Sequence, residues 1–160
     1  MELLKKELIK DLRQRPITAP KDADYTFTSE FMVYLYRQLY TYQTIGKEVL
    51  KEQIFEKRIA LLKANEIPAY QEVLDNRQKG FAEIQMEIKD IVFDYFNLIT
   101  KEYEMSYEKC RSDTKYQDEI AEIKKQVDIE YVDRKWDEVP AGLTVEKTRQ
   151  VIEKKQVFVN

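Results

Sequence analysis

The chain contains no histidine among its 160 residues. Histidine is the commonest general base and a frequent zinc, haem and copper ligand, so most such sites are excluded, as are Ser-His and Cys-His nucleophile pairs. The phosphate-binding motifs GxxxxGKS/T and GxGxxG are also missing. A carboxylate-only acid–base site, or magnesium held by Asp and Glu, stays open, but no pair among the 30 acidic residues stands out. We therefore predict that the protein is not an enzyme and has no catalytic, cofactor-binding or metal-binding residues.

Cysteine, glycine and proline are scarce. The single cysteine, Cys110, cannot form an internal disulfide and indicates a reducing compartment. No apolar run reaches the roughly 18 residues that a membrane span needs, and the N-terminus has no secretory h-region. We therefore expect an intracellular protein on the cytoplasmic side. Three glycines and four prolines argue against a turn-rich β fold and favour helices.

Charge of one sign is nowhere concentrated. The chain has 27 basic and 30 acidic residues, a net charge of −3, with the two signs interspersed as on solvated helix faces. The nearest approach to a basic patch lies between Lys5 and Lys21, and it includes Glu7 and Asp11. We predict no nucleic-acid partner and no membrane contact; attachment through the amphipathic N-terminus is the weakest alternative.

Apolar residues recur at three- and four-residue spacing in five segments, which predicts an all-α single domain over residues 1–160. The predicted helices cover residues 2–14, 30–64, 68–110, 114 to about 133–137, and 145–155. Pro16 and Pro20 predict an extended linker over residues 15–28, and residues 156–160 form a C-terminal tail. Thr28 or Ser29 should cap the second helix, Asn65 should end it, and Thr114 begins a capping box.

The connection Ala64–Pro68 between the second and third helices is short, and short connections join antiparallel neighbours. We therefore predict an elongated, coiled-coil-like hairpin that turns near residue 67. Gly80 is the one plausible break in the third helix. Against a break, a seven-residue spacing continues across it through Leu74, Phe81, Ile88 and Tyr95. Gly46 lies on the seam, where a missing side chain permits close packing.

The ends of these two helices far from the turn are apolar over most of their circumference, in residues 31–42 and 92–103. A helix that is apolar nearly all round is buried nearly all round, so the shorter helices are expected to pack there. Trp136 is predicted to anchor the C-terminal segment onto the bundle. Cys110 is predicted to be a half-buried, inert thiol.

The tyrosines provide the best functional lead. The chain has 11 of them, and four crowd into residues 34–42. Tyrosine and arginine are enriched at binding hot spots because they combine a large contact area with a polar tip. We predict a partner-binding set of exposed residues: Tyr34, Arg37, Tyr40, Val157, Phe158 and Val159. Alternatively, Tyr36 and Tyr42 fill the bundle while Tyr34 and Tyr40 are ordinary exposed residues.

These patterns favour a non-enzymatic structural or adaptor subunit that binds other protein chains through its helical faces. A complex with different chains is favoured over a homodimer. The alternative function is a helical bundle that holds a small apolar ligand in the wide core far from the turn.

Overall fold

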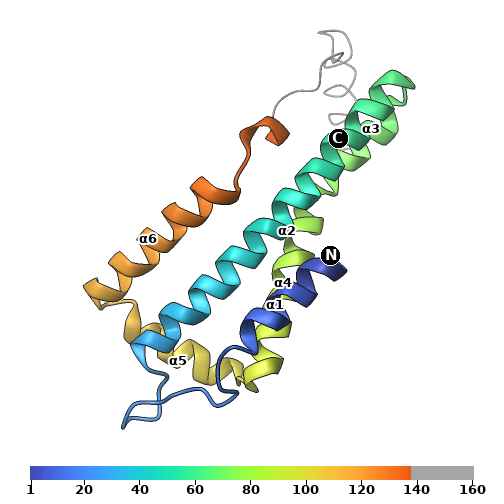
Figure 1. Ribbon diagram of the computed structural model, residues 1–160. Helices are drawn as coiled ribbons and strands as arrows, with labels where there is room; N and C mark the ends of the chain where they lie inside the picture. Colours follow the sequence, from blue (N-terminus) through green and yellow to red (C-terminus); the bar gives the residue numbers. More distant parts are fainter. Residues whose placement is uncertain (138–160) are drawn as a thin grey trace, which may run out of the picture. The chain divides into compact units, whose positions relative to one another are not determined.

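The structure of the chain is a computed structural model that describes residues 1–137, and it confirms the all-α class (Figure 1). Within these residues no strand is formed, although Lys21 and Phe27 make an isolated β-bridge. The elements are α1 (Glu2–Leu12), α2 (Ser29–Lys63), α3 (Ile67–Asp75), α4 (Arg77–Phe96), α5 (Thr100–Cys110), α6 (Thr114–Tyr131) and the 3-10 helix η1 (Arg134–Asp137). The predicted helix over 145–155 and the tail over 156–160 lie outside the described residues.

Both ends of α2 follow the capping residues that the sequence indicates. The Thr28 hydroxyl accepts a hydrogen bond from the backbone N–H of Phe31 at 3.2 Å, which satisfies one of the free donors of the first turn. Asn65 adopts a left-handed conformation with a φ of 55°. The N–H of Glu66 then donates to the carbonyl of Leu61 at 2.8 Å, the hydrogen bond of a Schellman motif. These two predictions are confirmed.

The prediction of one unbroken helix over residues 68–110 is wrong, because α3, α4 and α5 divide that stretch. Asn97, with a φ of 51°, ends α4 in the same way as Asn65 ends α2, and the N–H of Leu98 donates to the carbonyl of Phe93 at 2.8 Å. Gly80 lies inside α4, so it is not a break. Asn76, between α3 and α4, keeps a right-handed helical conformation, and its N–H donates to the carbonyl of Glu72. The seven-residue spacing therefore continues across it.

The start of α6 also differs in detail from its prediction. Asp113, rather than Thr114, is the N-cap, and its carboxylate accepts a hydrogen bond from the N–H of Lys115 at 3.0 Å. Aspartate is as good a cap as threonine, and its charge favours the positive end of the helix dipole. The helix therefore begins where it was expected, with its cap one residue earlier.

The chain divides into two compact units. Among the described residues, unit 1 comprises residues 1–46 and 84–132, and unit 2 comprises residues 47–83 and 133–137. Unit 1 contains α1, α5 and α6, with the first part of α2 and the last part of α4. Unit 2 contains the rest of α2 and α4, with α3 and η1.

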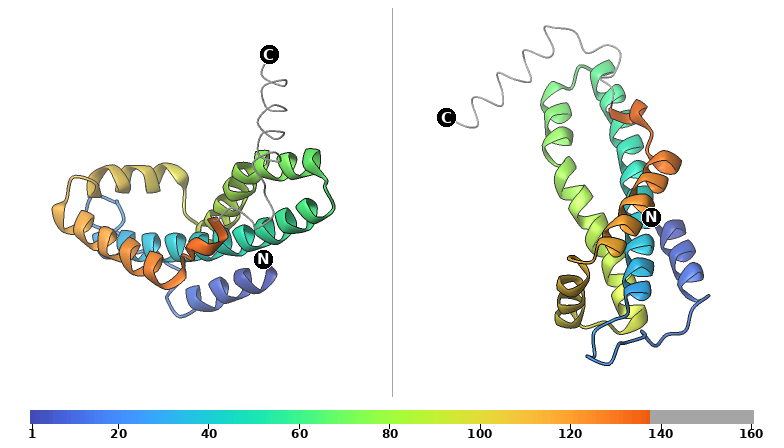
Figure 2. Two further views of the ribbon diagram at one scale, coloured as in Figure 1. Left: turned by 90° about the horizontal axis from the view of Figure 1, so that it is seen from above. Right: turned by 90° about the vertical axis from the view of Figure 1, so that its left-hand side faces the viewer.

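Unit 1 has a conventional core built from one face of each helix. In Figures 1 and 2, α1 and α6 flank the first half of α2 on different sides. The fully buried positions include Leu8, Leu12, Leu35, Ile88 and Val92, each at 0 % exposure. Gly46 lies where three helices meet, because a Cβ atom placed on it would be 2.7 Å from Ile84 Cγ2 and 3.3 Å from Leu4 Cδ2. The missing side chain therefore makes room for its neighbours, as predicted.

Aromatic rings close one end of unit 1. Phe31 meets Phe27 and Phe96 edge to face, with ring centroids 5.5 and 5.2 Å apart. The segment that carries Phe27 is held to α5, because its N–H donates to the Ser106 hydroxyl at 3.0 Å. Edge-to-face pairs add to the free energy gained from burial, by roughly 0.5–1.5 kcal/mol each.

Candidate functional site

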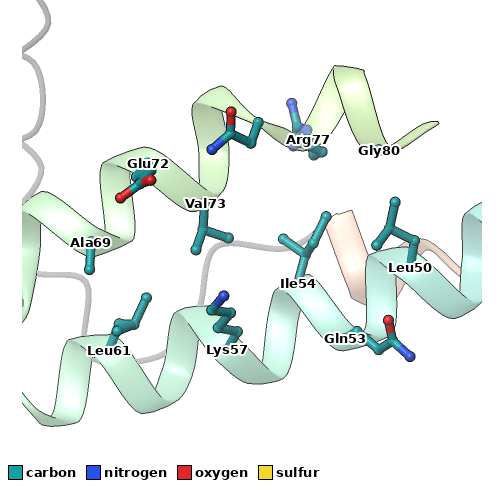
Figure 3. A pocket seen from close by; sticks show the side chains of 11 residues that line it. Leu50, Gln53, Ile54, Lys57, Leu61, Ala69, Glu72, Val73, Arg77 and Gly80 are labelled. Carbon is teal, nitrogen blue, oxygen red and sulfur yellow. The ribbon is translucent and has the colours of Figure 1, made fainter. Parts of the chain in front are cut away.

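An open groove of about 430 Å³ runs between the second part of α2 and the α3–α4 segment of unit 2 (Figure 3). Its apolar lining comes from both sides and consists of Leu50, Ile54, Leu61, Ala69, Val73 and Gly80. Its polar lining consists of Gln53, Lys57, Glu72, Asn76 and Arg77. The volume falls in the range of small-molecule and peptide sites, and the lining joins an apolar floor to a polar edge.

The helical repeat explains how these residues come to share a groove. Leu50, Ile54 and Leu61 lie on one face of α2, four and seven residues apart. The opposite side carries two small residues, Ala69 and Gly80. A Cβ atom added to Gly80 would be only 2.9 Å from Leu50 Cδ2, so the Leu50 side chain fills the space that Gly80 leaves.

A buried polar contact holds the two sides of the groove together. Arg58 is 7 % exposed and Tyr70 is 1 % exposed. The Nε and Nη2 groups of Arg58 donate to the Tyr70 hydroxyl at 3.1 and 2.8 Å, which ties α2 to α3. Around this contact, Leu62, Ile67 and Tyr70 form a small hydrophobic cluster. This contact and cluster therefore fix the position of α3 against α2 at one end of the groove.

A smaller pocket of about 200 Å³ lies on the same part of α2, next to η1. Trp136 lines it and packs edge to face on Phe55, with ring centroids 5.7 Å apart. Lys51 pairs with Asp137 at 3.5 Å and with Glu48 at 3.0 Å, and these contacts fix η1 to α2. Trp136 thus anchors the start of the C-terminal segment, as predicted.

The tyrosine cluster of residues 34–42 lies in unit 1 and is less exposed than predicted. Tyr34 is 8 % exposed, with the Arg15 guanidinium 3.9 Å from its ring centroid, so the expectation of an exposed Tyr34 is wrong. Burial raises the pKa of Tyr34 above its usual value. The period of α2 could not reveal this burial, because it depends on α1 and on the Arg15 segment that follows it.

Tyr40 is half-buried and engaged within unit 1. Its hydroxyl donates to the Asp128 carboxylate at 2.6 Å, and its ring stacks on Tyr36 with centroids 5.5 Å apart. Burial, together with the hydrogen bond to Asp128, raises the pKa of Tyr40 far above the ordinary tyrosine value. Arg37 is exposed, as expected. Val157, Phe158 and Val159 lie outside the described residues, so the structure brings the predicted set together only in part.

Two carboxylates of the segment before α2, those of Asp22 and Asp24, form ion pairs with one lysine. Lys109 of α5 pairs with Asp22 at 3.2 Å and with Asp24 at 2.9 Å. Hydrogen bonds from Lys109 and Thr26 hold the pKa of Asp24 well below its usual value. Across the described part of the chain, no three His, Cys, Asp or Glu side chains gather as a metal site would require.

Cys110 is 5 % exposed, and burial raises the pKa of its thiol. The thiol is therefore buried rather than half-buried as predicted, and a raised pKa leaves little thiolate at neutral pH, which agrees with the prediction that it is inert. None of the helices between residues 1 and 137 combines the length and apolarity needed to cross a membrane.

Sequence reasoning did not find the groove. The available signal was a pair of small residues, Ala69 and Gly80, on the side of the third helix that faces the apolar positions of α2. Comparison of the chain with protein-family models, with curated proteins and with solved structures finds no match.

Proposed function

We propose that the protein is a non-enzymatic subunit that binds another protein by receiving an amphipathic helix in the groove of unit 2. The observation that carries this proposal is an open groove of about 430 Å³ with apolar side chains at helical spacing along both sides. Grooves of this kind bind helices that present apolar anchors at positions i, i+3 or i+4, and i+7.

The dimensions of the groove suit a helix. Leu50 and Leu61 are 11 residues apart on α2, which at 1.5 Å per residue corresponds to about 16 Å, or three turns. Three turns accommodate anchors at i, i+4 and i+7. The opposite side runs antiparallel, because Gly80 meets Leu50 while Tyr70 meets Arg58. An added helix would therefore complete a three-helix arrangement, which is the usual way to bury such a surface.

The polar edge of the groove supports recognition of an acidic partner. Lys57 and Arg77 contribute two positive charges and Glu72 one negative charge. Neither Lys57 nor Arg77 forms an ion pair within residues 1–137. A carboxylate beside the apolar stripe of the incoming helix would complement these two cations, and such pairs set orientation and association rate.

The polar side chains of the groove do not resemble a catalytic set. Glu72 is the one acidic residue in the lining of the groove, and its carboxylate is exposed. General acid–base work needs a group that is positioned and perturbed by a neighbour. This supports a binding role, in which the lining excludes water and selects a partner.

The alternative function, a small apolar ligand in the core of unit 1, has less support. The aromatic rings there contact one another directly, with Phe96 5.2 Å from Phe31 and 6.1 Å from Tyr34 between centroids. Rings in mutual contact leave little room for a ligand. We also propose that the partner is a different chain and that it is neither a nucleic acid nor a membrane. Arg37, exposed on unit 1, stays a candidate contact on that unit alone. The long hairpin stays a prediction, supported near its turn by the contacts of Arg58 with Tyr70.

Site-specific photo-crosslinking tests the proposal. A photo-reactive phenylalanine replaces Gln53, which lines the groove, or Glu52, an exposed neighbour on the same helix that lines neither pocket. We expect position 53 to form an adduct with another chain, and the cross-linked peptide to come from an amphipathic helix. Position 52 should form little or none.

Two second-site variants make the test specific. Val73→Glu places a charge on the apolar floor and should abolish the adduct, whereas Lys79→Glu, at an exposed site of α4, should preserve it. Equal adducts from positions 52 and 53 would overturn the proposal. Adducts found only between two copies of the chain, or only with its own residues 138–160, would do the same.

A further inference from the structure

Two arginines of unit 2 line the smaller pocket without an acidic partner among residues 1–137. Arg58 and Arg77 both line this pocket of about 200 Å³, together with Lys51, Ile54, Phe81 and Trp136. Every ion pair formed by the pocket lining involves Lys51, which is bound by Glu48 and Asp137. The positive charge of the two arginines is therefore left without a counter-ion.

Arg58 is the more deeply buried of the two. It is 7 % exposed, and the hydrogen bonds of its Nε and Nη2 groups, at 3.1 and 2.8 Å, both go to the hydroxyl of Tyr70. A hydroxyl satisfies these donors but brings no negative charge. A buried cation without an opposing charge is unfavourable in a low-dielectric interior, so an anion beside it would be stabilised.

Arg77 supplies a donor that has no acceptor. Its Nε atom is shielded from solvent and has no hydrogen-bond partner in the described part of the chain. Buried donors are nearly always paired, so Arg77 keeps hydrogen-bonding capacity that the described residues do not use. The planar guanidinium presents its N–H groups in a fork whose geometry matches the oxygens of phosphates and carboxylates.

Asp137 is the one acidic residue in the pocket lining, and it is paired with Lys51 at 3.5 Å. Its charge is thereby offset at the η1 side of the pocket. Polar Gln78 completes the lining. The net charge of the lining is positive, and its one buried donor without a partner among the described residues is the Nε group of Arg77.

We propose that Arg58 and Arg77 bind an oxyanion, a phosphate or carboxylate group, in the pocket beside Trp136. This site adjoins the proposed helix-binding groove and shares Arg77 with it, because Arg77 lines both the pocket and the groove. Failure of either proposal leaves the other standing, because the crosslinking readout uses Gln53 and the oxyanion readout uses Trp136.

The only tryptophan of the chain makes the proposal directly measurable. Because Trp136 lines the pocket, its fluorescence should change when an anion enters. The full chain is titrated with inorganic phosphate and, in parallel, with acetate, at constant ionic strength so that general screening does not change. We expect a saturable change. Saturation by phosphate alone identifies a phosphate-class ligand, and saturation by acetate as well identifies a carboxylate such as an acidic side chain.

The control variants separate a specific site from a general charge effect. Arg77→Gln removes the charge and the unpaired Nε donor, and should weaken binding by about tenfold or more, as expected for loss of a charge-assisted hydrogen bond. Arg77→Lys keeps the charge without the fork and should give an intermediate affinity. Lys79→Gln changes an exposed lysine of α4 that does not line the pocket and should titrate like the wild type.

The melting temperature of each variant is measured first, because Arg77 is half-buried and a loss of folding must be distinguished from a loss of binding. An unsaturable response of the wild type to both anions would overturn the proposal. Equal weakening of binding by Arg77→Gln and Lys79→Gln would also overturn it, because the response would then depend on net charge and not on this pocket.

Discussion

Units 1 and 2 use parts of the same two helices, α2 and α4, but cover them differently. In unit 1, α1, α5 and α6 pack around these helices, and hydrogen bonds such as Tyr40 to Asp128 join one helix to another. In unit 2, the described residues add only α3 and the short η1. The result is a closed core in one unit and an open groove in the other.

This difference shows that apolar periodicity alone does not determine whether a surface is hidden. Leu35 and Leu61 both belong to the apolar pattern of α2, yet Leu35 is fully buried while Leu61 lines the groove. What differs is the number of neighbouring helices. A surface with too few neighbours is where a protein can bind something else, because burying it there still releases free energy.

The largest expected effect compares these two leucines directly. Leu35→Ala should cost about 2–5 kcal/mol of unfolding free energy, because it leaves a cavity in a closed core. Leu61→Ala should cost only about 1 kcal/mol, since the half-buried side chain already borders solvent. Urea unfolding followed by circular dichroism measures both. Losses of equal size would contradict the contrast between a closed and an open surface.

The two helical glycines give the next comparison. In either case alanine gains about 1 kcal/mol of helix propensity. At Gly46 the new Cβ atom would lie 2.7 Å from the branch methyl of Ile84, a stiff β-branched side chain, so we expect a net loss of about 1–2 kcal/mol. At Gly80 the close atom, at 2.9 Å, is a terminal methyl of Leu50 that can rotate toward the groove. Gly80→Ala should leave stability unchanged or raise it by up to about 1 kcal/mol.

Thermal melting of both glycine variants beside the wild type is sufficient to measure these effects. A substantial loss from Gly80→Ala would mean that Leu50 cannot move. The groove would then be more rigid, and its floor more tightly packed, than its openness suggests.

The smallest expected effect concerns alkaline pH and unit 1. Burial, with the hydrogen bond to Asp128, raises the pKa of Tyr40 in the folded protein. Below the unfolded tyrosine pKa of about 10 the hydroxyl is protonated in both states; above it the unfolded state loses its proton first, so stability falls as pH rises. Tyr40→Phe should lose about 0.5–1.5 kcal/mol at neutral pH and show a shallower fall above about pH 10.

Tyr25→Phe is the matched control, because the Tyr25 side chain is 82 % exposed. Urea midpoints collected between neutral and alkaline pH should coincide for Tyr25→Phe and the wild type at every pH. If Tyr40→Phe also followed the wild-type curve, the hydrogen bond to Asp128 would contribute nothing to folding.

Local signals in the sequence predicted the helical class and the ends of α2, because a cap such as Thr28 or Asn65 acts through its own hydrogen bonds. The end of α4 was missed for a related reason. Asn97 is followed by Leu98 and Ile99, which continue the apolar pattern and hide a left-handed residue. The burial of Tyr34 could not be predicted, since its neighbours Arg15 and Phe96 are distant in sequence.

The groove was missed because its openness depends on which helices do not cover it. A sequence shows the apolar stripe of each helix but not the number of elements that reach it. Arg58 and Arg77 likewise look like ordinary surface residues of charged segments until Tyr70 and Trp136 are placed beside them.

Cys110 is a built-in probe of how often unit 1 opens. The thiol is the only one in the chain and is 5 % exposed, so an alkylating reagent can reach it chiefly when the surrounding helices separate. When reclosing is slower than alkylation, the labelling rate equals the frequency of that opening, and when it is faster the rate reports the population of the open form. Since Trp136 belongs to unit 2, labelling of the thiol and emission of the indole report on the two units separately in one molecule.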